Sequence, residues 1–211
     1  MRSLRPRLAP SALATLLTLA LAAPAARAQI AIGDKAPLAE VPMLNVDGKQ
    51  LTIEDISEGK KGTLVVFTCN HCPWARMWQT RVAEIGNRAL AAGFGVVAIN
   101  SNDPEAYAED AYPEMKKRAR MLKFKFPYVV DGTSDVARAF GATRTPEAYV
   151  FDAEGKLVYH GTVDDNPKDA AQVKDAWLRD AVNEVAAGKT VTTAETKALG
   201  CSIKYRDKKT S

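Results

Sequence analysis

Two cysteines separated by two residues, Cys69-Asn70-His71-Cys72, lie at the junction between a predicted strand and a predicted helix. The apolar, β-branched run Thr63 to Thr68 precedes them, and the helical segment Pro73 to Ala92 follows them. The N-terminus of a helix carries unpaired N–H groups and partial positive charge, which stabilise a thiolate. The thiolate is the reactive form of cysteine, and two thiols this close can form a disulfide. The motif therefore predicts reversible dithiol/disulfide chemistry.

The first 28 residues have the features of a secretory signal peptide. Arg2, Arg5 and Arg7 precede an apolar stretch from Ser11 to Ala23, which is shorter than the ~20 residues of a membrane span. Ala26-Arg27-Ala28 fits a small-x-small cleavage site. We therefore predict cleavage after residue 28, export across the inner membrane to the periplasm, and no stable insertion in the membrane.

Removing this signal peptide changes the charge balance of the chain. The full sequence of 211 residues has 29 basic and 25 acidic residues, and the signal peptide holds four arginines and no acidic residue. The remaining chain, residues 29–211, therefore has 25 of each. A neutral chain gives no reason to expect nucleic acid as a partner. Its length suits one domain with a hydrophobic core.

The order of predicted elements indicates an α/β protein. Two β-hairpins have turn-forming clusters between their strands, at 45–48 and 152–156, and Gly141 ends a short helix. The expected elements are a hairpin of 41–44 and 50–53, a helical turn through 56, strands at 64–67, 94–99 and 128–130, helices at 73–92, 113–124 and 135–140, a hairpin of 148–151 and 157–159, a helix at 168–187 and a polar tail from about 188.

Four segments resemble the thioredoxin superfamily, specifically its redoxin branch. They are Gly33 to Pro37, Phe67 to Pro73, the dipeptide Thr145-Pro146 just before a strand, and Gly155 to Gly161. That branch groups exported thioredoxin-like proteins with the alkyl hydroperoxide reductase and thiol-specific antioxidant family. The resemblance implies a three-layer α/β/α fold with a central mixed sheet, an N-terminal β-hairpin and a C-terminal tail. The sequence departs from the family pattern in having Asn-His between the cysteines and an enlarged loop over 102–125.

The roles of the motif residues follow from their position and from this resemblance. Cys69, nearest the strand, is expected to be the exposed sulfur and the attacking nucleophile, and Cys72 to be the buried sulfur that resolves the mixed disulfide. His71 is expected to stabilise the Cys69 thiolate, as the histidine of a Cys-Pro-His-Cys loop does, or to be a solvated loop residue. The resemblance makes Pro146 a cis-proline, with the backbone of Thr145 free to pair with an extended substrate strand.

Three further residues are candidates for the site, and two of them, Glu147 and Cys201, allow two interpretations. Glu147 could accept a proton from Cys72 or could be a carboxylate at the sheet edge. Trp74 is expected at the rim of the site, where it would contact substrate, whereas Trp78 is expected in the core. Cys201, in a Gly-Cys-Ser-Ile-Lys-Tyr ending, could be a third redox thiol docking near Cys72 or a buried inert thiol, and the inert interpretation is preferred.

The leading functional hypothesis is an exported thiol–disulfide oxidoreductase that needs no cofactor. Its partners would be protein or small-molecule disulfides and thiols, together with a redox partner protein. One alternative is a thiol peroxidase with antioxidant activity, in which Cys69 attacks a hydroperoxide with help from Thr68 and from Arg76 or Arg144. The non-enzyme alternative is copper capture, as in a metallochaperone, because soft thiolates suit Cu(I). No dedicated metal site is predicted, since the chain has only two histidines.

Overall fold

The structure is a computed structural model that describes residues 29–207. The predicted signal peptide, residues 1–28, lies outside the described residues, as do residues 208–211. Within residues 29–207, none of the helices combines the length and the apolar character that crossing a bilayer requires.

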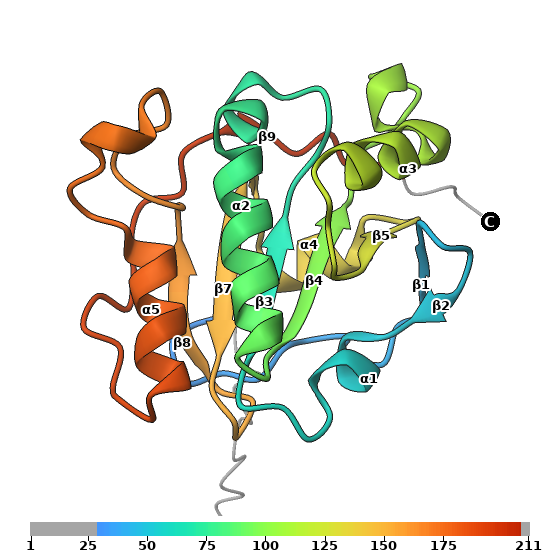
Figure 1. Ribbon diagram of the computed structural model, residues 1–211. Coiled ribbons are helices and arrows are strands. Elements are labelled where there is room, and N and C mark those ends of the chain that lie inside the picture. Colours follow the sequence, from blue (N-terminus) through green and yellow to red (C-terminus); the bar gives the residue numbers. More distant parts are fainter. Residues whose placement is uncertain (1–28, 208–211) are drawn as a thin grey trace, which may run out of the picture.

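A seven-stranded mixed sheet forms the centre of the protein (Figure 1). Its strands are β1 Met43–Asn45, β2 Gln50–Leu51, β3 Thr63–Phe67, β4 Gly95–Asn100, β5 Tyr128–Val130, β7 Glu147–Phe151 and β8 Leu157–Gly161. They lie in the order β2-β1-β5-β4-β3-β7-β8. The central strands β5, β4 and β3 are parallel, and β1 and β7 flank them in antiparallel pairing. Both predicted hairpins are confirmed.

Helices cover both faces of this sheet. They are α1 Ile53–Ser57, α2 Pro73–Ala91, α3 Tyr112–Met121, α4 Asp135–Phe140 and α5 Trp177–Ala186, with 3-10 turns η1 Ala108–Asp110 and η2 Ala170–Gln172. One core contains Leu64 and Val66 of β3 packed under α2, α3 and α5, and the other contains Val65 and Phe67 packed under α1 and α4. Figure 1 shows α2 and α5 in front of the sheet and α4 behind it. The predicted three-layer α/β/α fold is therefore confirmed.

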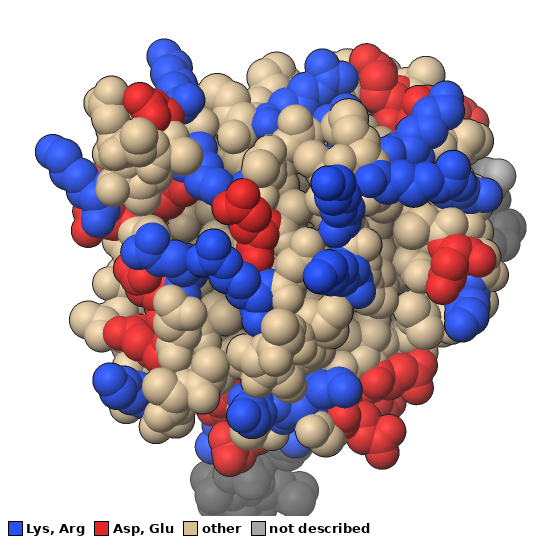
Figure 2. Space-filling model, in the orientation of Figure 1, with Lys and Arg blue, Asp and Glu red and all other residues tan. Residues whose placement is uncertain are grey.

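Both signs of charge are spread over the face that carries α2 and α5. Figure 2 shows lysines and arginines scattered there with acidic side chains among them. This distribution agrees with the balanced charge of residues 29–211.

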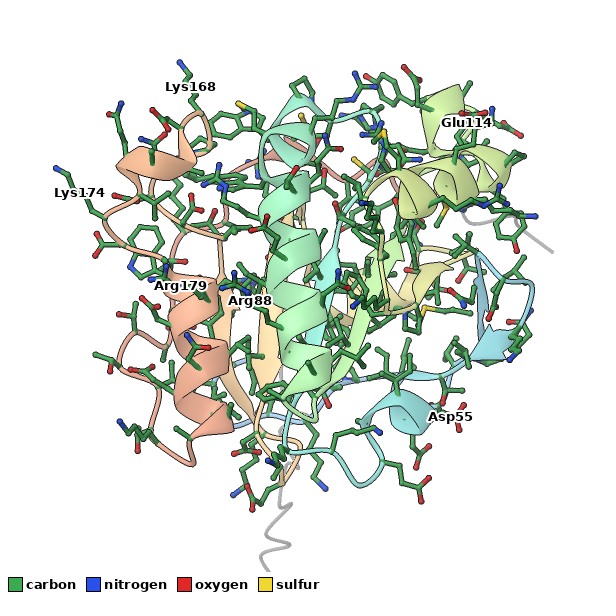
Figure 3. All side chains as sticks on the ribbon, in the orientation of Figure 1. Asp55, Arg88, Glu114, Lys168, Lys174 and Arg179 are labelled. Carbon is green, nitrogen blue, oxygen red and sulfur yellow. The ribbon has the colours of Figure 1, made fainter. Side chains whose placement is uncertain are left out.

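The last long helix is shorter than its sequence indicates. Residues 168–187 were predicted to be helical, but α5 begins only at Trp177. The side-chain oxygen of Asn166 accepts hydrogen bonds from the backbone N–H groups of Lys168 and Asp169, at 3.2 and 3.0 Å. Such local bonds compete with helix formation. Figure 3 shows Lys168 and Lys174 on the resulting loop, pointing away from the body of the protein.

The tail after α5 returns to the sheet and forms a strand that the sequence did not predict. Cys201–Ser202 is β9, and it pairs with Arg144–Thr145, which is β6, in a separate two-stranded sheet. In Figure 1, β9 lies beside the first turn of α2. The signal was missing because a two-residue strand shows no alternation of polar and apolar residues.

Candidate active site

The Cys69–Cys72 segment connects β3 to α2, as predicted. Strand β3 ends at Phe67, α2 begins at Pro73, and Cys72 is the N-cap residue, with an extended backbone. Proline is favoured in the first turn because its missing N–H would have no partner inside the helix. All three cysteines are free thiols in the structure. The motif therefore lies at the positive end of the 19-residue helix α2.

Thr145 contacts the sulfurs of both motif cysteines. Its hydroxyl oxygen is 3.2 Å from Cys69 Sγ, and its carbonyl oxygen accepts a hydrogen bond from Cys72 Sγ at 3.3 Å. The peptide bond between Thr145 and Pro146 is cis, as the resemblance implied. Two segments separated by more than 70 residues thus meet at the sulfurs.

Cys201 joins the two motif cysteines in one cluster. In the pairing of β6 with β9 it lies opposite Thr145, and its side chain packs against Cys69, Cys72 and Ala75. Cys72 is fully buried, Cys69 is 6 % exposed, and Cys201 is partly exposed. The expectation that Cys69 is exposed is wrong for this arrangement, because its sulfur is buried against the Thr145 hydroxyl. Cys72 is the more deeply buried of the two, as expected.

The contacts among the cysteines move their pKa values in opposite directions. Hydrogen bonding from the Cys69 thiol lowers the pKa of Cys72 to about 4, with burial opposing this and Cys201 supporting it. The same hydrogen bond raises the pKa of Cys69 well above its ordinary value, and burial and the Asp110 carboxylate raise it further. The shared contact therefore acts on the two thiols of the motif in opposite directions. The pair therefore gives up its first proton easily and its second with difficulty.

Asp110 holds the loop between the two cysteines, and the sequence analysis missed it. The side chain is buried, and one oxygen accepts a hydrogen bond from the Asn70 N–H at 2.6 Å. The other oxygen lies 2.5 Å from His71 Nδ1 and accepts a hydrogen bond from Asn102 at 2.9 Å. Asp110 comes from η1, inside the loop that the sequence indicated only as an enlargement. Nothing local in the sequence connects it to the motif, which lies about 40 residues away.

His71 is held between Asp110 and an aromatic ring. The ring of Tyr107 stacks on its imidazole, with centroids 3.7 Å apart and planes 4° from parallel. The carboxylate of Asp110 bonds the Nδ1 atom. His71 is therefore neither a freely solvated residue nor a lone cation beside Cys69, because its ring is paired with a buried carboxylate.

Glu147 has a structural position that differs from both sequence interpretations. It is 1 % exposed and lies on the sheet face that carries Tyr149, whereas Cys72 lies at the start of α2 on the opposite face. Its oxygens accept hydrogen bonds from the N–H groups of Thr143 and Arg144, both at 2.8 Å, and lie 2.7 Å from His160 Nε2. Glu147 therefore supports the turn before Pro146 rather than contacting Cys72.

The two tryptophans have the predicted locations. Trp74 is 36 % exposed at the start of α2, whereas Trp78 is fully buried and donates a hydrogen bond to Asp164 at 2.7 Å. Trp78 is therefore in the core, and Trp74 is at the surface two residues after Cys72.

The two arginines expected to support a peroxidase have other partners. Arg76 donates to the Asn70 carbonyl at 2.9 Å, and Arg144 donates to the Gly200 carbonyl at 3.3 Å.

The ligand atoms of Cys69, His71 and Asp110 lie within 4.8 Å of one another, so these three could hold a metal ion. This set differs from the ligands expected for copper, which were Cys69, Cys72 and a histidine, and its single thiolate makes it less soft than Cu(I) prefers.

Comparisons with known proteins agree with this geometry. The model of the family described as Redoxin matches residues 31–176. No curated protein matches the sequence. A crystal structure of an uncharacterized conserved protein from Geobacillus kaustophilus is 37 % identical, with a TM-score of 0.76 over 84 % of this chain and 94 % of that one. A hypothetical protein from Sinorhizobium meliloti 1021 is 33 % identical, with a TM-score of 0.77 over 84 % and 96 %.

A more distant match identifies the fold. The solution structure of a thioredoxin-like protein in its oxidized form is 23 % identical, with a TM-score of 0.57 over 75 % of this chain and 97 % of that one. The chain therefore has a thioredoxin-like fold, as its segments indicated.

Proposed function

This chain belongs to the Redoxin family, and we propose that it is a thiol–disulfide oxidoreductase that works through Cys69 and Cys72. The contact of Thr145 with both sulfurs carries this proposal, because it places the two thiols side by side at the N-terminus of α2. The substrates would be protein or small-molecule disulfides, and a redox partner protein would restore the starting state.

The reduced pair supports a two-step exchange. Cys69 Sγ attacks one sulfur of a substrate disulfide and forms a mixed disulfide, while the other substrate sulfur leaves as a thiolate. The Cys69 proton moves to the thiolate form of Cys72, which lies in the same cluster. After Cys72 loses this proton, it attacks Cys69 Sγ, releases the second substrate thiolate and leaves a Cys69–Cys72 disulfide. The substrate gains two electrons and the protein loses two.

Export to the periplasm is part of the proposal. Its support is the signal-peptide pattern of residues 1–28. In an oxidising compartment, disulfides of exported proteins persist and provide substrates.

Turnover of a model disulfide substrate tests this function. Wild-type protein should reduce insulin disulfides, Cys69→Ser should be inactive, and Cys72→Ser should accumulate mixed disulfides through Cys69. Lys174→Ala, on an exposed loop away from the sulfurs, serves as the control and should retain activity. Full turnover by Cys72→Ser would contradict the dithiol mechanism.

The same preparation separates the alternatives. Consumption of hydroperoxide without insulin reduction would favour the thiol peroxidase. Stoichiometric Cu(I) binding in a metal titration, with neither activity, would favour copper handling.

A further inference from the structure

The C-terminal tail occupies the edge at which a substrate peptide was expected. Strand β9 pairs antiparallel with β6, so that Cys201 lies opposite Thr145 and Ser202 opposite Arg144. Downstream, Ile203 donates its N–H to the carbonyl of Thr143 at 2.9 Å. Addition of a strand to a free edge is a common mode of peptide recognition. Here the protein provides that strand itself, and the predicted free backbone of Thr145 is already paired.

The tail is anchored on both sides of Cys201. Upstream, the Thr196 N–H donates to the His160 carbonyl at 3.0 Å. Downstream, the backbone of Lys204 donates to the Asn102 side chain at 2.8 Å and accepts from the Asp103 N–H at 2.7 Å. These contacts hold the tail on the site independently of any sulfur bond.

Gly200 lets the tail approach this closely. A Cβ atom at position 200 would lie 2.2 Å from the carbonyl oxygen of Thr145, a distance at which the backbone would have to shift. Only glycine fits there without moving one of the two segments. The sequence therefore contains a residue suited to placing the next one, Cys201, against the motif.

The Cys201 side chain lies between the cluster that contains Cys72 and the solvent. The Cys201 side chain packs against the cluster that contains Cys72, and the interaction of the two thiols helps to lower the pKa of Cys72 and, after burial, to raise the pKa of Cys201 to about 11. Cys201 is partly exposed to solvent, whereas Cys69 and Cys72 are both buried. A sulfur in this position can exchange a disulfide with the buried Cys72 on one side and with an external partner on the other.

We propose that Cys201 is a third redox-active thiol, which takes over the disulfide from Cys69 by exchange with Cys72. This inference rests on the proposed function. The Cys201 thiolate attacks Cys72 Sγ of the Cys69–Cys72 disulfide, and a Cys72–Cys201 bond forms as the original S–S bond breaks. Cys69 leaves with the electron pair as a thiolate and takes up the proton that Cys201 released. One disulfide and one thiol are present before and after, so no external oxidant or reductant is consumed.

Before this exchange the disulfide joins two buried cysteines, and after it the disulfide includes the partly exposed Cys201. A redox partner protein could then reduce it at Cys201 without displacing the tail from β6. The freed Cys69 returns to its thiol state at the same time. The third cysteine would therefore separate the side of the site that meets substrate from the side that meets the reductant.

Peptide mapping tests the exchange directly. Trypsin leaves Cys69 and Cys72 together in the peptide 62–76 and places Cys201 in the peptide 198–204. A Cys72–Cys201 bond therefore links two peptides, whereas a Cys69–Cys72 bond stays within one. Protein equilibrated with oxidised and reduced glutathione is quenched with acid, blocked with N-ethylmaleimide, digested and analysed by mass spectrometry.

The wild type should contain both disulfides, and Cys69→Ser should contain the linked peptides alone. Cys201→Ser should lose the linked peptides and retain the Cys69–Cys72 disulfide. An internal Cys69–Cys72 disulfide in the wild type with no linked peptides in either the wild type or Cys69→Ser would overturn this inference and leave the proposed function standing. Absence of both disulfides in the wild type would overturn the two together.

A glycine variant tests the role of the tail without altering a cysteine. Gly200→Ala should displace the tail from Thr145, abolish the linked peptides and increase the alkylation rate of Cys69. Gly132→Ala is the matched control, since a Cβ atom there meets nothing within 4 Å. Equal amounts of linked peptide in the two variants would contradict the requirement for a docked tail.

Discussion

Replacement of Asp110 by asparagine is expected to lower the pKa of the Cys69 thiol, because it removes a buried negative charge beside that sulfur. Asp110 is 2 % exposed, and a carboxylate oxygen lies within 4.8 Å of Cys69 Sγ. At an effective dielectric constant near 20, two unit charges at this separation interact by about 3 kcal/mol, which corresponds to roughly 2 in pKa. This value is an upper limit, because hydrogen bonds to His71 and Asn102 take up part of the charge.

The assay is the rate of iodoacetamide alkylation against pH in a Cys72→Ser/Cys201→Ser background, where Cys69 is the remaining cysteine. Because the thiolate is the reacting form, a lower pKa moves the midpoint of the rate profile to lower pH. Glu109→Gln is the matched control, since it removes the same charge from an exposed position in the same turn and should leave the midpoint in place.

The same substitution should also reduce stability. The new amide group would face the Asn102 side-chain donor in place of an accepting oxygen, and a buried donor left without an acceptor costs about 1–3 kcal/mol. Urea unfolding followed by tryptophan fluorescence measures this loss. An alkylation midpoint that stays in place or moves to higher pH in Asp110→Asn would refute the electrostatic reasoning.

Three further substitutions test other contacts of the site. Thr145→Val should raise the pKa of Cys69, because the hydroxyl that lowers it is lost, whereas Thr145→Ser should restore the alkylation profile. Glu147→Gln should lower the free energy of unfolding by about 1–3 kcal/mol, because it weakens the contact with the buried His160 ring and the bonds from the partly buried N–H groups of Thr143 and Arg144, and an unchanged urea midpoint would contradict this role. Trp78→Phe should cost about 2–4 kcal/mol through the smaller side chain and the lost hydrogen bond to Asp164, measured by thermal unfolding.

Most helices and strands could be predicted because their signals are local. The run Thr63–Phe67 is β-branched and apolar and became the fully buried strand β3. Thr52 caps α1 through its side chain, and Gly141 ends α4 in the left-handed conformation that glycine adopts easily. In each case the residues that determine the element are adjacent in the chain.

The predicted helix 168–187 was too long at its N-terminal end, because turn-forming side chains there compete with helix formation. The apolar residues before Trp177 suggested a longer helix, but Ala171 is exposed and Asn166 binds the backbone N–H groups that the helix would have needed. Turn-forming side chains outweighed a weak apolar pattern there.

For the active site, the sequence alone determined the chemistry: two thiols separated by two residues at the start of a helix. Their environment was decided by tertiary structure. Asp110 reaches the motif from 40 residues away, and the tail reaches β6 across 56 residues between Arg144 and Gly200. Such contacts depend on the order in which strands lie in the sheet, and no local pattern records that order. The pKa of a buried thiol depends on the charges and donors within a few ångströms, so the groups that surround each sulfur became visible only in the folded chain.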